Sequence, residues 1–376
     1  MQFSAMTMNM FFPSNDDPGD DTRIIDMAVA QSIWFAELGY HVWFTDHHFR
    51  GPWHSNPMQF ASYVAPLIPS DRYMGFGVLS VPFYHPLRLV ESMNLLDQMT
   101  KGKVLFGVGS GWQGTEPAGL GIDTEAHASG RLGDETLDVM EKLWSFKYGD
   151  PEYTFKVGSN TGTIKRRVMP APYSKPHTTI IRVATREAGL IKAAQKGWPV
   201  FVGVLGADLA ETMQTYRKAL DAANHPQEVK DNCLRWCSYD WIGVTVAATD
   251  EEALAREKRA QAETMAIRTD FARRHGRVDG PVIKPKTPPA PGQAADSYAK
   301  GGDMRATIAG TPETVAKKVQ ALKDQGIGNL HLRFLGEWAG ETRYVCEESA
   351  ELFAKEVMPR FADDVPVKKP AMEPAE

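Results

Sequence analysis

Residues 43–49, WFTDHHF, place one acid and two imidazoles directly after a short apolar run. Asp46, His47 and His48 could bind a metal, move a proton, or belong to an ordinary polar loop. A metal site needs three or more converging ligands, and neighbouring loop side chains rarely face one centre, so no metal is expected. Imidazole titrates near neutral pH. From these residues alone, His47 is a candidate for handling a proton or an ordinary loop or capping histidine, whereas His48 is expected to make a structural hydrogen bond and Asp46 to orient either ring.

A second chemical group lies in residues 184–194, ATREAGLIKAA. Here the hydroxyl of Thr185 and the guanidinium of Arg186 come together at the start of a predicted helix. Free backbone N–H groups and the helix dipole favour an anion at such a position, and arginine adds a bidentate partner. The segment predicts a phosphate-binding cradle.

Four glycines in residues 107–114 fit the spacing of a dinucleotide-binding fingerprint. That motif requires a helix to open at its third glycine, whereas WQGTEPAGLG has the composition of a loop. We favour a turn in which the chain backbone approaches a ligand closely. The fingerprint remains the alternative.

The elements that must position these groups alternate between strands and helices. Helical spacing with capping residues is found at 22–38, 85–102, 129–146, from 187, 207–223, 250–268, 311–326 and 343–357, with Thr311 as an N-cap. Strand patterns occupy 3–12, 40–45, 74–83, 103–111, 179–185, 198–203, 240–247 and 329–334. Eight strands interleaved with helices predict an α/β fold, a (β/α)8 TIM barrel. A doubly wound open sheet is the alternative.

Two segments interrupt the alternation within one predicted domain, residues 1–360. Residues 147–178 contain EYTFKV and TIKRRVM around GSNTG, which predicts an inserted β-hairpin. Residues 276–306 are rich in Pro, Gly and Lys without periodicity, which is typical of a mobile, lid-like loop. Residues 361–376 are expected to form a flexible tail.

The composition excludes several classes of protein. The 376 residues carry a net charge of −5, so no nucleic-acid partner is expected. The three cysteines do not suffice for a disulfide framework, and reduced thiols fit a cytoplasmic protein. The N-terminus lacks the basic region of a signal peptide, and no apolar run approaches the length of a membrane span.

Ligands of a barrel lie at the carboxyl ends of its strands, so residues at these ends are candidates for binding substrate. Arg333 alternates with the apolar Leu330, Leu332 and Phe334, and it points into the barrel if those three pack on helices. Three further candidates, each also compatible with a core position, are His85, Trp112 and Trp338.

Residues 85–112, HPLRLVESMNLLDQMTKGKVLFGVGSGW, resemble the luciferase-like flavin-dependent monooxygenases, which include the bacterial luciferase α chain. DHHF at 46–49 is similar to the acid-His-His-Phe motif of that family. AGTPETVAKKVQALKDQGIGNLHLRF at 309–334 is similar to its penultimate helix and last strand. The resemblance covers most of residues 1–270 and 305–357.

The resemblance implies roles for individual residues. His47 matches the active-site base, and Gly77 and Val78 fall at a bulge whose non-proline cis peptide supports the isoalloxazine ring. Ser110 stands where the luciferase α chain has a phosphate-binding arginine, and Arg131 matches a second family arginine that could compensate. The loop that holds the phosphate corresponds to Val183, Thr185, Arg186 and Gly189.

The resemblance also implies the chemistry. Reduced FMN from a separate NAD(P)H:flavin reductase would react with dioxygen to a flavin hydroperoxide, which oxygenates a small organic, cyclic or heteroaromatic substrate. A homodimer is expected. The alternatives are a deazaflavin-dependent hydride-transfer enzyme on the same barrel, a non-catalytic flavin-binding accessory subunit, and a metal-dependent barrel hydrolase.

Overall fold

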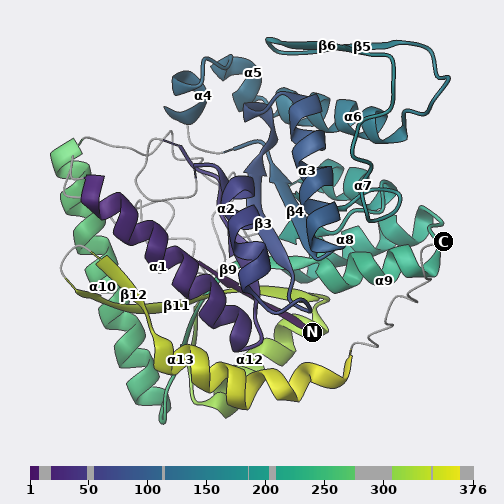
Figure 1. The fold of residues 1–376 in the computed structure, drawn as a ribbon. Helices are drawn as coiled ribbons and strands as arrows, with labels where there is room; N and C mark the ends of the chain where they lie inside the picture. Colours follow the sequence, from purple (N-terminus) through teal and green to yellow (C-terminus); the bar gives the residue numbers. More distant parts are fainter. Residues whose placement is uncertain are drawn as a thin grey trace.

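Eight parallel strands close into a barrel in the computed structural model (Figure 1), which confirms the predicted (β/α)8 fold. The structure describes residues 1–7, 18–48, 55–111, 115–184, 186–202, 209–275, 307–339 and 342–364. In order around the barrel the strands are β1 (Gln2–Met6), β2 (His41–Phe44), β3 (Met74–Ser80), β4 (Val104–Gly109), β7 (Thr179–Val183), β8 (Val200–Val202), β9 (Ser238–Val246) and β11 (Asn329–Ala339). The pairing of β1 with β11 and of β11 with β9 completes the ring.

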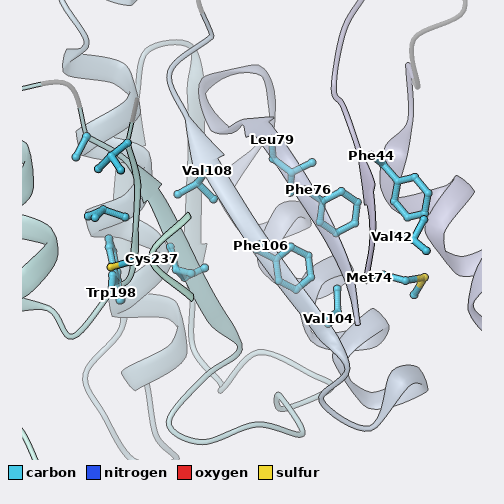
Figure 2. Packing of buried hydrophobic residues seen from close by; sticks show 14 of the residues in the cluster. Val42, Phe44, Met74, Phe76, Leu79, Val104, Phe106, Val108, Trp198 and Cys237 are labelled. Atoms are coloured by element: carbon cyan, nitrogen blue, oxygen red, sulfur yellow. The ribbon is translucent and has the colours of Figure 1, made fainter. Parts of the chain in front are cut away.

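Alternation along the strands separates two layers of core. Outward side chains such as Val42, Phe44, Phe76 and Phe106 pack in the large cluster beneath the helices (Figure 2). Inward side chains form a second, smaller cluster inside the barrel, which contains Trp43, Leu105, Ile181, Phe201 and Trp236. Strands covered on both faces need apolar residues at almost every position, which is why these segments are continuous apolar runs.

Helices surround the barrel and follow most strands. The longer ones are α1 (Pro18–Glu37), α2 (Pro57–Val64), α3 (Pro86–Thr100), α6 (Arg131–Ser145), α7 (Glu187–Gln195), α8 (Leu209–Ala222), α9 (Gln227–Trp236), α10 (Asp250–His275) and α12 (Pro312–Asp324). Short helices α4 (Thr115–Gly119) and α5 (Thr124–Ala128) follow β4. Within the described residues, no helix combines the length and apolarity that crossing a membrane requires.

The inserted hairpin is confirmed within the predicted segment as β5 (Tyr153–Val157) and β6 (Asn160–Ile164), although β6 begins earlier than TIKRRVM. It projects from the barrel beside α6 (Figure 1). Strand β10 (Thr307–Gly310), which was not predicted, extends the sheet at β9. The loop predicted at 276–306 lies outside the described residues.

The helix predicted at 343–357 is wrong in its first part. Residues Thr342–Val345 form β12, antiparallel to the extended end of β11. The β-branched and aromatic residues of this segment favour a strand once β11 provides a partner. Helix α13 (Glu347–Leu352) follows, and helical turns continue through η3 (Phe353–Val357) and η4 (Met358–Asp364), so the tail expected from 361 is helical at its start.

Candidate active site

His47 and Glu116 meet at the carboxyl end of the barrel. His47 lies in the loop after β2, and Glu116 lies in the first turn of α4 after β4. The Nδ1 atom of His47 is 3.0 Å from Oε1 of Glu116, whose side chain is only 1% exposed. The same oxygen accepts the backbone N–H of His48 at 2.8 Å. An ionised Glu116 can only accept, so the proton of His47 lies on Nδ1 in this pair.

Asp46 fixes the same loop through hydrogen bonds to two other residues. Its Oδ2 accepts the backbone N–H of Ser80 at 2.9 Å, and its Oδ1 accepts the hydroxyl of Tyr84 at 3.0 Å. Nε2 of His48 lies 3.4 Å from Oδ1 of Asp46. The carboxylate of Asp46 raises the pKa of His48 above its ordinary value, against the opposing effect of partial burial. His48 is thus placed against a carboxylate, as the prediction of a structural role requires.

Val78, Gly109 and Val183 form an apolar floor at the carboxyl end of the barrel. The β3–β4 register shifts between Phe76 and Leu79, and the Gly77–Val78 peptide is cis, as the resemblance implied. Val78 and Val183 are half-buried and belong to the inner cluster. A Cβ on Gly109 would lie 2.9 Å from Cγ2 of Val78 and 3.6 Å from Cγ2 of Val183. Gly109 therefore lets Val78 approach the backbone of β4 more closely than a side chain at this position would allow.

Beneath this floor lies a buried imidazole. The ring of His331 is 4.1 Å from that of Trp43 and 4.8 Å from that of Phe201 between centroids. Both of its nitrogens are buried without a hydrogen-bond partner among the described residues. Burial lowers the pKa of His331 to about 3, so the ring is neutral. Arg333, two residues on, is also buried and points into the barrel as predicted, because the intervening apolar residues pack outward.

The predicted phosphate cradle is brought together only in part. Arg186 is the exposed N-cap of α7 and makes no capping bond with its own side chain, while Gly189 is half-buried in the first turn. Thr185 lies outside the described residues. Ser110 faces the N-terminal turn of α6, where a Cβ on Gly133 would overlap its hydroxyl. Arg131 is exposed, and its guanidinium pairs with Glu135 at 2.8 Å.

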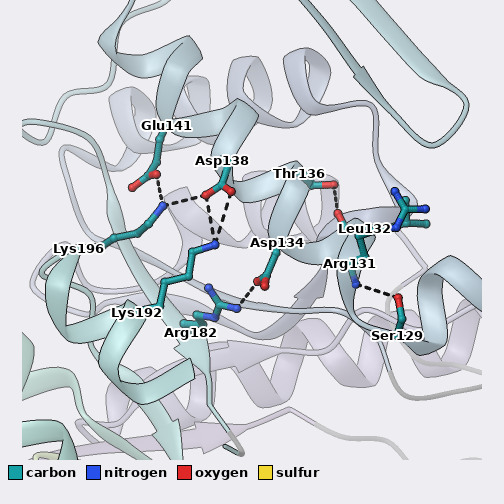
Figure 3. Close-up of polar contacts among 10 residues, drawn as sticks. All are labelled: Ser129, Arg131, Leu132, Asp134, Thr136, Asp138, Glu141, Arg182, Lys192 and Lys196. Atoms are coloured by element: carbon teal, nitrogen blue, oxygen red, sulfur yellow. Dashed lines mark hydrogen bonds and ion pairs between the residues drawn. The ribbon is translucent and has the colours of Figure 1, made fainter. Parts of the chain in front are cut away.

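Ion pairs fix the two helices that flank this cradle. Arg182 pairs with Asp134, and Lys192 and Lys196 pair with Asp138, so β7 and α7 are tied to α6 (Figure 3). These contacts tie the N-terminal turn of α6 to β7, and the C-terminal end of α7 to the middle of α6.

The substrate candidates are less well placed. His85 precedes α3, and its Nε2 bonds the carbonyl of Thr161 at 3.1 Å, so it anchors the hairpin. Trp112 lies outside the described residues. Trp338 lies in β11, but its side chain is not among those described. Their substrate roles stay predictions.

Glu116 was not identified from the sequence. It stands in a segment with two glycines and a proline that resembles a loop, and its partner is 69 residues away. An available clue was the acid directly after a predicted barrel strand, at the position where ligand-binding groups collect.

Known monooxygenases resemble this chain along most of its length. A 4-hydroxyprotoasukamycin monooxygenase of Streptomyces nodosus subsp. asukaensis is 27% identical over 365 residues, which cover 93% of this chain and 89% of the relative. A limonene 1,2-monooxygenase of Rhodococcus erythropolis is 26% identical over 346 residues, covering 89% and 79%.

Solved structures share the fold. The oxygenating constituent of 3,6-diketocamphane monooxygenase of Pseudomonas putida, a type II Baeyer–Villiger enzyme in complex with FMN, has a TM-score of 0.66 at 18% identity and covers 96% of this chain and 99% of its own. An F420-dependent secondary alcohol dehydrogenase has a TM-score of 0.61 at 18% identity, covering 96% and 99%. The family model of the luciferase-like monooxygenases matches residues 1–329, and the chain belongs to this family.

Proposed function

We propose that this chain is the oxygenating component of a two-component, FMN-dependent monooxygenase. The observation that carries the proposal is the pairing of His47 with buried Glu116 at the carboxyl end of the barrel. A carboxylate that holds an imidazole in one tautomer is the arrangement expected of a proton-transfer group. In a monooxygenase, such a group can transfer protons during the oxygenation reaction.

The residues present fit a flavin. Two half-buried valines, packed closely over Gly109, offer an apolar surface to an isoalloxazine ring. The N-terminus of α7 with Arg186 offers N–H groups and a guanidinium to a phosphate. Reduced FMN bound here would supply the electrons that activate dioxygen. For Arg131 to assist at the phosphate, its ion pair with Glu135 must open.

The protein's own contribution begins at His47. Glu116 occupies Nδ1, so His47 would exchange protons with the reacting groups through Nε2. The charge of Glu116 stabilises the imidazolium that forms when His47 accepts a proton. Tyr84 and Ser80 hold Asp46, and through it the loop that carries His47, which fixes the position of the base.

We propose a small organic, cyclic or heteroaromatic substrate. The names of the two relatives refer to limonene and to 4-hydroxyprotoasukamycin. Arg333 is the strongest of the polar candidates, because a buried guanidinium inside the barrel suits a substrate carboxylate or a carbonyl oxygen of the flavin. The aromatic candidates, Trp112 and Trp338, would supply apolar walls.

The proposed partners are a separate NAD(P)H:flavin reductase and a second copy of the chain. The related P. putida structure is described as an oxygenating constituent, which implies that another constituent exists in that system. Gel filtration with light scattering tests the dimer. To test delivery of reduced FMN by diffusion, the reductase is kept behind a dialysis membrane. Oxygenation that continues under this condition supports delivery by diffusion.

Labelled oxygen tests the activity. Purified protein is supplied with FMN, NADH, a flavin reductase and a panel of cyclic substrates under ¹⁸O₂. We expect one labelled oxygen atom in the product and oxygen consumption that rises with substrate. Product without label would overturn the proposal. Hydride transfer with reduced F420 in parallel assays, without oxygen uptake, would favour the deazaflavin alternative.

A pair of variants tests the base. His47→Ala should abolish coupled oxygenation, while FMN binding, followed by the quenching of flavin fluorescence, is retained. The matched control is His225→Ala, which removes an imidazole bonded to the carbonyl of Ala194 far along the chain. Full coupled activity in His47→Ala would show that another residue is the base. A wild-type protein that binds FMN without oxygenating any substrate would point to an accessory subunit.

A further inference from the structure

Two cations share one aromatic ring at the opposite end of the barrel. Lys103 immediately precedes β4, Arg235 lies in the last turn of α9 before β9, and Tyr73 immediately precedes β3. Nζ of Lys103 lies 4.6 Å from the centre of the Tyr73 ring, and the guanidinium carbon of Arg235 lies 5.7 Å from it. Both cations therefore lie at the amino ends of the strands, away from His47.

Neither cation has an acidic partner among the described residues. The polar contact of Lys103 is the hydroxyl of Tyr73 at 3.5 Å, and that of Arg235 is Oε1 of Gln2, also at 3.5 Å. The Nε atom of Arg235 is buried without a hydrogen-bond partner among these residues. A lysine carries three donors and an arginine five, so most of the donors of this pair are unused within the protein.

The basic groups around this pair are an arginine that has its own acidic partner and a neutral histidine. Arg72 lies nearby, but it pairs with exposed Asp71 and donates to the carbonyl of Gly39. His41 is buried beside Tyr73 and Trp236, and its pKa falls to about 3, first through burial and then through Arg72, Arg235 and Lys103. The imidazole is therefore neutral and adds no charge, and its nitrogens contact the side chain of Gln2 and the N–H of Tyr73.

We propose that Lys103, Arg235 and Tyr73 form a binding site for a small oxyanion, a phosphate or a carboxylate, at the amino end of the barrel. Each head group lies within about 6 Å of the centre of the same ring, and each can donate to an anion oxygen. The hydroxyl of Tyr73, which accepts from Lys103, has its own proton to donate. An anion at this position neutralises two like charges that no protein carboxylate balances, so it stabilises the folded barrel. This site is separate from the proposed flavin cradle and does not depend on the proposed function.

Inorganic phosphate is the probe. Isothermal titration of the full chain should show saturable binding of one phosphate, and the thermal midpoint should rise in phosphate relative to sodium chloride of equal ionic strength. The same titration with acetate tests a carboxylate, and comparing its affinity with that of phosphate identifies the preferred oxyanion. No saturable binding of either anion, or equal midpoints in phosphate and chloride, would overturn the proposal.

Variants locate the bound anion. Lys103→Gln and Arg235→Gln should each weaken phosphate binding by about tenfold or more, and Lys103→Arg should retain it. Lys101→Gln is the matched control, because Lys101 lies over the ring of Tyr173 and not that of Tyr73. If Arg186→Gln abolishes binding while Lys103→Gln and Arg235→Gln do not, phosphate occupies the predicted cofactor cradle and this site is refuted. If either glutamine variant fails to fold, Arg235→Lys, which keeps the charge but loses the planar donor fork, should still weaken phosphate binding in the same titration, and an unchanged affinity would count against the site.

Discussion

Oε1 of Glu116 makes two hydrogen bonds in the candidate site, one with each of two neighbouring histidines. It bonds Nδ1 of His47 and the N–H of His48, while Oε2 is buried without a hydrogen-bond partner among the described residues. Burying a carboxylate that is only partly satisfied costs folding free energy. A role in the chemistry of His47 therefore explains the buried Glu116 better than a contribution to folding stability does. Replacing Glu116 separates these two roles.

Glu116→Gln should lower coupled oxygenation by roughly 10- to 100-fold, a part of what positioned acid–base groups contribute. The glutamine oxygen can still accept both hydrogen bonds, but it no longer stabilises the imidazolium. Product formed per NADH oxidised, measured across pH, reports the loss. Glu125→Gln, an exposed glutamate on α5, is the control. Unchanged product yield in Glu116→Gln would remove this residue from the mechanism.

His48 should contribute to stability in a pH-dependent way. Because Asp46 raises the pKa of His48, its contribution is fully present below the unfolded pKa of about 6.5. It is lost as the pH rises through the higher folded pKa. His48→Gln should therefore destabilise the protein more at pH 5.5 than at pH 9, by no more than about 1 kcal/mol. Urea unfolding at the two pH values measures the difference, and equal losses would contradict it.

At the scale of elements, the close approach of three strands determines the floor of the site. Gly109→Ala would place a methyl group 2.9 Å from Cγ2 of Val78, and valine has little freedom to move away. We expect a loss of about 1–3 kcal/mol in stability from overpacking and weaker FMN binding, because Val78 shifts. Flavin fluorescence titration and urea unfolding measure the two effects.

Gly189→Ala is the control for this change. Its Cβ would meet Ala184 at an ordinary 3.8 Å, in the first turn of α7. It should leave folding stability unchanged or raised, since alanine favours a helix over glycine. FMN binding as tight in Gly109→Ala as in the wild type would show that the flavin does not use this floor.

Elements with local sequence patterns were predictable, and contacts between distant segments were not. The eight strands are apolar runs, and the alternation within the last of them predicted that Arg333 points into the barrel. The N-cap at Thr311 was also correct, since its hydroxyl accepts the N–H of Thr314. Glu116 could not be identified, because its significance depends on a histidine 69 residues away. For the same reason the strand β12 is missed, since its partner is the extended end of β11.

At the scale of the whole molecule, the barrel interior holds an uncharged imidazole at each end. His41 lies near the amino ends of the strands and His331 beneath the floor of the candidate site, and burial lowers the pKa of each to about 3. In the unfolded chain both rings bind protons near pH 6.5. Between about pH 6.5 and pH 3 the unfolded state therefore binds more protons than the folded state. Each buried histidine makes folding less favourable as the pH falls through this window.

Replacing His331 should reduce this acid sensitivity. From pH 7.5 to pH 5, one buried neutral histidine costs about 2 kcal/mol of unfolding free energy, at 1.36 kcal/mol per proton and pH unit. His331→Phe keeps a ring between Trp43 and Phe201 but cannot bind a proton, so it should lose about 2 kcal/mol less than the wild type over this range. Urea unfolding at both pH values measures the difference. Phe201→Leu disturbs the same cluster without changing titration, and it should keep the wild-type pH dependence. An equal pH dependence in His331→Phe and the wild type would mean that His331 is protonated in the folded barrel, and that its nitrogens have a partner there.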